Sequence, residues 1–453
     1  MDTTGQHRES LQLEVSNRQI LKIALPIGLA ILVPQLNFIT NNIFLGHLST
    51  EALALASITG VYYLIFAAIG FGLNNGLQAL ISRRAGEDKP QEIGKLFSQG
   101  VFVAIIIAII GVLITWLITP SIFSYFIKDP DDLQKAVSFL KIRIWGLFFL
   151  YIYQLRNALL VGTNNSKLLI FGTLAEALSN ALFDYLLIFG KWGFPALGFN
   201  GAAVASVIAE FIGMFVIYLV IRKRGIGKQF ALFAPFKWNP SILMLILSFS
   251  APLIFQHAIS IISWEYFYLL IVKHGETALG VSNIMRNVFG FFGAFVWAMA
   301  ATTNTMVSNI IGQGKQDQVF LLLKKIIVIN LIMTITVSIL LNIFPALFLS
   351  VYGQSADFVA EAIPVIRVIS VALVLMSVST VFLNAVTGSG NSRITLLVEI
   401  QAIIFYCIYV YLVLDYFFLD ITYGWMSEWL YWIVLMTPSW LYLRSGKWKN
   451  KQI

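Results

Sequence analysis

The sequence has little of what a water-soluble enzyme needs. Only 11% of its 453 residues are charged, four are histidines, and Cys407 is the single cysteine. A soluble domain carries about 25% charged residues, so this chain has too few to cover a water-facing surface. One cysteine excludes an intramolecular disulfide. Because Cys407 lies in an apolar run, we expect an inert, lipid-buried thiol.

The motifs of common enzymes are also missing from the sequence. The histidines show no metal-ligand spacing, and there is no Gly-x-Ser-x-Gly, no His-Glu-x-x-His and no phosphate-binding loop ending in Lys-Ser/Thr. We therefore expect no enzyme, no cofactor and no metal apart from a transported ion. Any uphill movement would draw its energy from an ion gradient or from a partner.

Long apolar runs are what the sequence does contain. Hydrophobic residues make up 58% of the chain, and its mean hydropathy is +0.83. Lipid allows only helices or closed barrels as spanning forms, and runs of about 20 apolar residues favour helices. The sequence thus predicts an all-α membrane protein with twelve transmembrane helices. They are expected near residues 20–44, 53–81, 96–119, 137–161, 168–190, 200–221, 246–272, 280–311, 323–350, 363–386, 395–418 and 425–443.

The two halves of the chain repeat each other at one fixed offset, which we call the repeat offset. It is the separation between Pro26 and Pro252, and it also relates the loop at 162–167 to the loop at 388–393. Six predicted helices in each half return the chain to its starting side, so the halves are expected to be parallel pseudo-repeats. The predicted division is an N-terminal six-helix lobe at 1–221, a cytoplasmic linker at 222–245 and a C-terminal six-helix lobe at 246–453.

Basic residues set the expected orientation. With both termini in the cytoplasm, 21 Lys and Arg side chains fall in the inner loops and tails and four in the outer loops. This bias follows the positive-inside rule. Because the charge is spread over every second loop, it does not indicate nucleic-acid binding. The stretch 1–19 is polar and mixed in charge, so no cleavable signal is expected.

Ionisable residues inside predicted helices are functional candidates, since each is costly in lipid. Asp184 lies four residues after Asn180, on the same helix face. The pair could bind a cation, or Asp184 could be an ordinary interhelical hydrogen-bonding acid. Glu176 could face the same cavity or pair with Arg156. The intramembrane charges considered are Glu176, Arg156, Glu210, Arg286 and Glu399.

Glu265 lies among aromatic residues in the seventh predicted helix. Its neighbours Trp264 and Tyr268 could help to bind an organic cation through cation–π contact. An interfacial aromatic belt around a snorkelling acid is the equal alternative. His257, two turns earlier, is expected to be a core histidine rather than a proton relay.

The sequence resembles the multidrug and toxic compound extrusion (MATE) family over essentially its whole length. The most specific parts are the twin loops at 162–167 and 388–393 and the stretch from Asn180 to Ser206. The resemblance implies a V-shaped, two-lobed exporter. We expect it in the inner membrane, and nothing in the sequence demands more than a monomer. It would exchange organic, often cationic drugs or toxic metabolites for H⁺ or Na⁺ by alternating access.

The resemblance also implies site residues. A cation site would use Asp184, Asn180 and the Ser206 hydroxyl, with Asn41 where many members carry aspartate. Loss of that aspartate disfavours a carboxylate pair but leaves a sodium site reasonable. The substrate cleft would be lined by Glu265, Gln35, Asn37, Trp264, Tyr268 and His257. A flippase for a lipid-linked precursor is the alternative, resting on Arg143, Arg156, Arg286 and Arg367.

Overall fold

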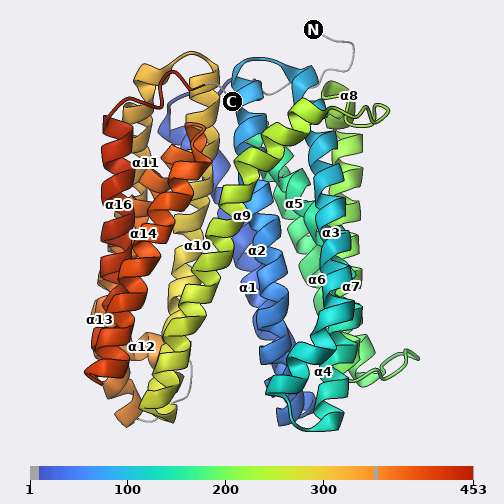
Figure 1. Cartoon of the computed structure of the whole chain (residues 1–453), viewed down its shortest axis with the longest axis vertical. Coiled ribbons are helices and arrows are strands. Elements are labelled where there is room, and N and C mark those ends of the chain that lie inside the picture. Colours follow the sequence, from blue (N-terminus) through green and yellow to red (C-terminus); the bar gives the residue numbers. More distant parts are fainter. Residues whose placement is uncertain (1–9, 351–355, 452–453) are drawn as a thin grey trace. The chain divides into compact units, whose positions relative to one another are not determined.

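The computed structural model describes residues 10–350 and 356–451, and every regular element in those ranges is a helix (Figure 1). Two compact units emerge from the packing. Of the described residues, the first unit holds 10–11 and 29–254, and the second holds 12–28, 255–350 and 356–451. Two helices contribute to both units, α1 (Asn17–Leu48) and α9 (Pro240–Ile271).

The first unit is an antiparallel helical bundle. Its remaining elements are α2 (Thr50–Gly86), α3 (Pro90–Phe126), α4 (Pro130–Arg143), α5 (Gly146–Gly162), η1 (Ser166–Leu168), α6 (Leu169–Phe189), α7 (Phe199–Lys223) and α8 (Ile226–Gln229). Local sequence sets several of the helix ends. Ser49 caps α2 by accepting the Ala52 amide, and Asp129 caps α4 ahead of Pro130. Gly190, in the left-handed conformation, ends α6.

The second unit is also a helical bundle, in which α13 packs against several other helices. Its remaining elements are η2 (Val272–His274), α10 (Glu276–Gly312), η3 (Gln316–Gln318), α11 (Val319–Ile343), α12 (Pro345–Ser350), α13 (Ala356–Gly388), α14 (Ser392–Val410), the π-helical turn η4 (Tyr411–Tyr416), α15 (Ile421–Trp425) and α16 (Ser427–Arg444). Helix α13 packs against α10, α11 and α16. Its residues Val365, Ile369, Leu373 and Met376 lie in the apolar core of this unit.

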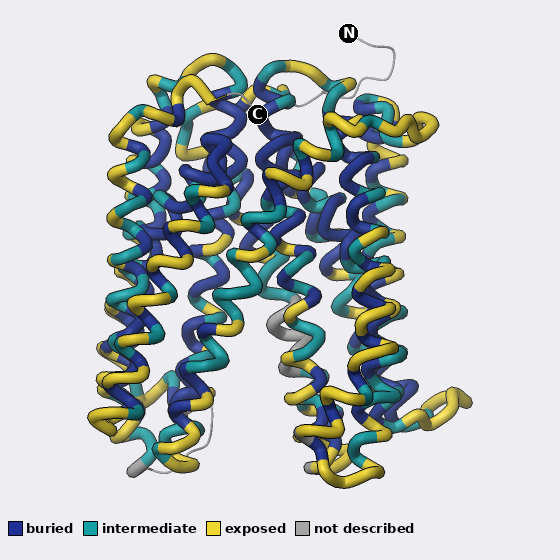
Figure 2. Tube along the Cα trace, in the orientation of Figure 1, coloured by how far each residue is buried: buried dark blue, intermediate teal, exposed yellow. Residues whose placement is uncertain are grey.

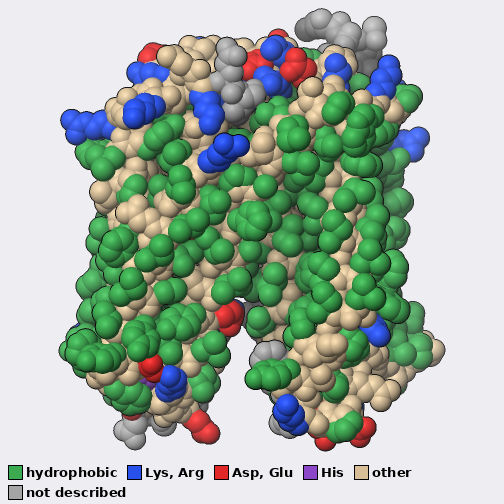
Figure 3. All heavy atoms as spheres, in the orientation of Figure 1, with side chains coloured by type: hydrophobic (Ala, Val, Ile, Leu, Met, Phe, Trp, Pro, Cys, Tyr) green, Lys and Arg blue, Asp and Glu red, His purple; other side chains and the backbone are tan. Residues whose placement is uncertain are grey.

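The helices have the length and composition of membrane spans. Within the described ranges, eight helices are long and apolar enough to cross a bilayer, and the pair α4 and α5, bent by 43°, makes a ninth. Buried and exposed residues alternate along the helices (Figure 2). In each unit taken by itself, hydrophobic side chains cover the visible flanks, and Lys and Arg gather at one end (Figure 3). The chain is therefore a multi-pass membrane protein, while the count of twelve spans stays a prediction.

The sequence duplication extends to the backbone of each unit. Asn164 and Gly390 are separated by the repeat offset, and both have positive φ, at 63° and 101°. The glycines that end the preceding helices make matching close approaches. A Cβ on Gly162 would lie 2.8 Å from the Ile81 side chain, and one on Gly388 would lie 2.6 Å from the Asn304 carbonyl oxygen. Both loops are tight helix–helix turns, as the sequence predicts.

The predicted domain boundaries stay a prediction. In the stretch predicted as a linker, α7 ends at Lys223 and α9 begins at Pro240, with the short α8 between them. The division into compact units falls between residues 28 and 29 and between residues 254 and 255. These two points are again separated by the repeat offset, so each unit incorporates the first part of the other repeat's first helix.

Candidate functional site

Asp184 and Asn180 lie together on α6, which packs against α7. The Asn180 side-chain amide donates to Asp184 Oδ2 over 3.1 Å. Asp184 is fully buried and Asn180 nearly so. The four-residue spacing thus brings the two side chains into contact, as a helix requires. The result is a buried carboxylate held by a neutral amide on its own helix.

The later part of α1 lies beside this stretch of α6. The Phe44 ring is 6.5 Å from the ring of Tyr185, the residue after Asp184, and 6.1 Å from that of Phe189. Asn41 is half-buried and precedes Phe44 by about one helical turn. Ser206 is half-buried on α7, the helix that packs against α6. Gln35 and Asn37 belong to α1, but their side chains lie outside the described part.

A second buried acid of the first unit, Glu210 on α7, is fixed by an arginine. Arg143 at the end of α4 donates to both of its oxygens, over 2.9 and 2.6 Å. The Tyr63 hydroxyl donates to Glu210 Oε1 over 3.0 Å, and the guanidinium lies 3.7 Å from the Tyr63 ring centroid. Gly146 provides the space, because a Cβ there would lie 2.1 Å from Glu210 Oε2. This is a bidentate pair of high geometric quality.

The alternative pairing of Glu176 with Arg156 is not found in the described structure. Arg156 donates to the backbone carbonyl of Met214, and its guanidinium lies 5.5 Å from the Tyr218 ring centroid. Arg156 thus contacts a main-chain acceptor and an aromatic ring instead of the Glu176 carboxylate. Glu176 on α6 is instead within electrostatic range of Glu210 and Arg143.

Glu399 is the buried acid of the second unit, on α14, with 1% of its surface exposed. Gln256 and Ser260 of α9 and Tyr431 of α16 all donate hydrogen bonds to its carboxylate. Three helices thus meet at this one side chain. In contrast to Glu210, its hydrogen-bonding partners are neutral. His257 is half-buried on α9, next to Gln256.

The aromatic residues around Glu265 already face a cation of the protein itself. Glu265 Oε1 lies 3.8 Å from Arg286 Nη2 on α10. The same guanidinium is 4.9 Å from the Trp264 ring centroid and 5.3 Å from that of Tyr268. The arrangement is a cation–π and ion-pair cluster. An organic cation at this place would have to compete with Arg286.

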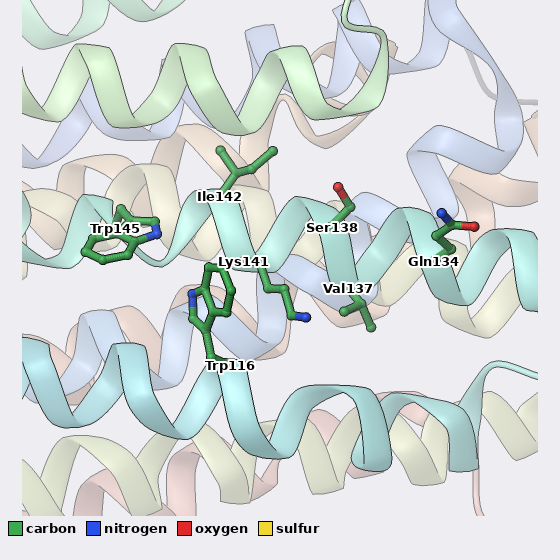
Figure 4. A pocket seen from close by; sticks show the side chains of 7 residues that line it. All are labelled: Trp116, Gln134, Val137, Ser138, Lys141, Ile142 and Trp145. Atoms are coloured by element: carbon green, nitrogen blue, oxygen red, sulfur yellow. The ribbon is translucent and has the colours of Figure 1, made fainter.

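A shallow groove of about 460 Å³ lies between α3 and α4 on the first unit. Figure 4 shows Lys141 of α4 and Trp116 of α3 pointing toward each other, with Trp145 beyond the end of α4. The Lys141 ammonium lies 5.1 Å from the Trp116 ring centroid. None of the predicted site residues lines this groove, so we do not assign the coupling chemistry to it.

Sequence reasoning did not identify several residues that complete these sites. Tyr63 and Gly146 shape the Arg143–Glu210 pair, and Tyr431 contacts Glu399. Glu428, nearly fully buried in the first turn of α16, was also missed. The contacts of Tyr63 and Tyr431 join positions 147 and 32 residues apart, so no local spacing indicates them. Glu428 lies three residues after Trp425, at the start of an apolar run, and an acid at such a position can be recognised in the sequence as a candidate for burial.

Comparison with protein families gives a match to each half of the chain. The family model described as MatE matches residues 26–186 and again residues 252–412. The starting points of the two matched segments are separated by the repeat offset. Together the segments cover well over half of the chain.

Curated relatives and solved structures point the same way. The chain is 23% identical over 442 residues to a probable multidrug resistance protein NorM of Thermotoga maritima, covering 96% of this chain and 94% of the relative. It is 24% identical over 300 residues to the multidrug resistance protein MdtK of Photorhabdus laumondii, covering 65% of each.

Among solved structures, a MOP superfamily transporter from Pyrococcus furiosus matches with a TM-score of 0.87 at 17% identity and 100% coverage of both chains. A MATE crystal structure in complex with MaL6 matches with a TM-score of 0.88 at 17% identity, covering 98% of each. At these identities the structural likeness shows the fold alone.

Proposed function

Because the chain belongs to the MATE family of multidrug efflux transporters, we propose that it exports organic, often cationic and amphipathic compounds by ion antiport. Members of this family are transport proteins and not enzymes. In the proposed cycle, H⁺ or Na⁺ enters as a drug or toxic metabolite leaves, through alternating access of the two halves. Coupling requires that ion and compound favour different conformations, because a ligand with equal affinity for both shifts neither.

The observation that carries the proposal is the buried pair of Asp184 and Asn180. A fully buried carboxylate is costly unless it is paired or neutralised. The Asn180 amide that donates to it carries no charge. Because burial makes the ionised carboxylate costly, a cation that reaches Asp184 from water would be bound favourably, and its departure would leave a costly charge. The difference in free energy between the ion-bound and the ion-free site is the physical basis for biasing the equilibrium between conformations.

Two ions fit the donors at this place. A proton would bind Asp184 directly. Na⁺ would use the carboxylate with neutral oxygens from Asn180, Asn41 and Ser206, since hard cations take oxygen ligands. Asn41 belongs to the part of α1 that lies beside α6, which supports its inclusion. Ser206 belongs to α7, which packs along α6, and its hydroxyl would complete the set of oxygens.

The proposed setting is the inner membrane, with both termini in the cytoplasm and a monomer as the working unit. The distribution of Lys and Arg along the sequence supports this orientation. The flippase alternative gains no support. Two of the arginines on which it rested, Arg143 and Arg286, face Glu210 and Glu265, and the curated relatives are multidrug resistance proteins.

Efflux of ethidium from proteoliposomes tests the proposal. Purified protein is reconstituted with ethidium inside, and a proton gradient, a sodium gradient or neither is imposed. The proposal predicts efflux above protein-free liposomes with at least one gradient, and the effective ion identifies the coupling chemistry. Folded protein that moves none of a panel of organic cations with either gradient would contradict it.

A further inference from the structure

Glu399 is a buried carboxylate whose partners are all neutral hydrogen-bonding groups. The Ser260 and Tyr431 hydroxyls donate to its Oε1, and the Gln256 amide donates to Oε2 over 3.2 Å. The three donors come from α9 and α16, while the acid sits on α14. In the described part of the chain no Lys or Arg forms an ion pair with it. A charge is thus buried at the meeting point of three helices without a counter-charge.

The hydrogen-bonding partners of Glu399 differ chemically from those of Glu210. Arg143 can only donate and keeps its charge, so it holds Glu210 in the ionised form. A serine or tyrosine hydroxyl can donate or accept, and a glutamine offers both an amide and a carbonyl. If Glu399 takes a proton, the carboxylic acid can donate to a rotated Ser260 or Tyr431 oxygen. The hydrogen bonds are then satisfied in both protonation states.

Titratable groups also lie on the helices that meet at Glu399. His257 of α9 is a neighbour of Gln256 in the chain, Glu428 of α16 precedes Tyr431 by three residues, and the Tyr406 ring of α14 lies 5.8 Å from the Tyr431 ring.

Helix α13 contacts α14 at Thr387, whose hydroxyl oxygen lies 2.9 Å from that of Thr395 and is hydrogen-bonded to it. Thr395 precedes Glu399 on α14 by about one helical turn. Its own charged residues Glu361 and Arg367 lie at least about 30 Å along the helix from Thr387. The groups that contact the Glu399 carboxylate directly are therefore the amide of Gln256 and the hydroxyls of Ser260 and Tyr431.

We propose that Glu399, with Ser260, Gln256 and Tyr431, is a second proton-exchange site of this transporter, located in the second unit. A proton from the aqueous phase binds the carboxylate, the site changes from negative to neutral, and one of the two hydroxyls, of Ser260 or of Tyr431, turns to accept the hydrogen bond of the acid. Because the acid joins α14 to α9 and α16, this change weakens three charge-assisted hydrogen bonds at once. Proton exchange stands on this geometry alone, while its coupling to transport rests on the proposed function.

Infrared difference spectroscopy of the purified protein tests proton exchange directly. A pH titration of wild type is expected to show a carboxylic-acid C=O band that Glu399→Gln loses. Glu361→Gln, which removes an exposed acid of the same unit, is expected to keep the band. Tyr431→Phe is expected to move its frequency, because one hydrogen-bonding partner is gone. A band unchanged in Glu399→Gln, or no titrating band in wild type, overturns the proposal.

If Glu399→Gln does not fold, Glu399→Asp and Tyr431→Phe decide the matter. Both variants retain a carboxyl group. The proposal requires each of them to change the frequency of the C=O band and the pH at the midpoint of its titration. Unshifted titrations in both variants contradict it.

Coupling is read separately in proteoliposomes. Proton-driven efflux is expected to fall about tenfold in Glu399→Gln, a typical size for energetic coupling between sites, and to recover in Glu399→Asp with an altered pH profile. Wild-type efflux retained in Glu399→Gln removes the coupling role. Absence of efflux in wild type itself would count against the proposed function and leave the infrared result standing.

Discussion

At the scale of single residues, the buried acids of this protein differ in the partners that hold them. Glu210 is fixed by the bidentate Arg143 and by Tyr63. Asp184 is held by the amide of Asn180, and Glu399 by an amide and two hydroxyls. A permanently charged donor such as Arg143 keeps an acid ionised. Neutral partners do not cancel the charge of a carboxylate, so a cation can still bind to it and leave again. We therefore infer a structural role for Glu210, while the cation-exchange role of Asp184 remains the proposal made above.

The structural role of the Arg143–Glu210 pair predicts strong non-additivity. Arg143→Met leaves a buried, uncompensated carboxylate and is expected to destabilise the protein by about 3–5 kcal/mol. The double variant Arg143→Met/Glu210→Leu removes both charges and is expected to be clearly more stable than the single one. Thermal melting in detergent measures both. A double variant as unstable as Arg143→Met would show that the charge pair is not the source of the loss.

Asn41 gives a second prediction at this scale. Asn41→Asp is expected to be tolerated and to steepen the pH dependence of efflux, because it adds a titratable group to the part of α1 that lies beside α6. The initial rate of gradient-driven efflux across a pH series measures this. A pH profile identical to that of wild type would place Asn41 outside the ion site.

The residues that sequence reasoning could identify are those joined by local spacing. Asn180 and Asp184 are four residues apart on one helix, so their contact follows from helical geometry. Arg286 lies on α10, whereas Glu265 lies on α9, and Tyr431 is 32 residues from Glu399 in the sequence. Such contacts depend on how helices pack, and a single sequence does not specify that packing. The aromatic residues near Glu265 left open an organic-cation site or an interfacial aromatic belt, and neither interpretation indicated the contact with Arg286.

At the scale of elements, small residues allow helices to approach closely. On α2, Gly72 and Gly76 form a Gly-x-x-x-Gly pair that faces the first part of α9 within the first unit. A Cβ on Gly72 would lie 2.5 Å from Ile254 Cα, and one on Gly76 would lie 2.2 Å from Ser250 Oγ. Such a seam brings two backbones together and gains van der Waals contact, which is the main source of helix association in lipid.

The close contact of Gly72 and Gly76 with α9 predicts that alanine substitutions at two glycines of α2 differ in their effect on stability. Gly72→Ala forces α2 away from the α9 backbone and is expected to destabilise the protein by about 1–3 kcal/mol. Gly60→Ala, where a Cβ would meet no atom within 4 Å, is expected to be neutral or slightly stabilising. Melting temperatures in one detergent compare the two. Equal melting of Gly72→Ala and wild type would show that the seam is loose.

At the scale of the whole molecule, the internal duplication organises the chain. The repeat offset appears in the paired loops, in the positive φ angles of Asn164 and Gly390, and in the two matches to the family model. The acids are not duplicated with it, because Asp184 corresponds to Val410 and Glu399 corresponds to Thr173. The two segments that match the family model therefore carry different acids, which the sequence duplication alone would not predict.

The most direct test of the central claim compares wild type with Asp184→Asn in gradient-driven efflux from proteoliposomes. The substitution keeps the size and polarity of the side chain but removes its charge, so folding, expression and melting are expected to stay near wild type. Wild-type protein is expected to expel the dye when the effective ion gradient is imposed, and Asp184→Asn is expected not to. Full gradient-driven efflux by folded Asp184→Asn would contradict the account.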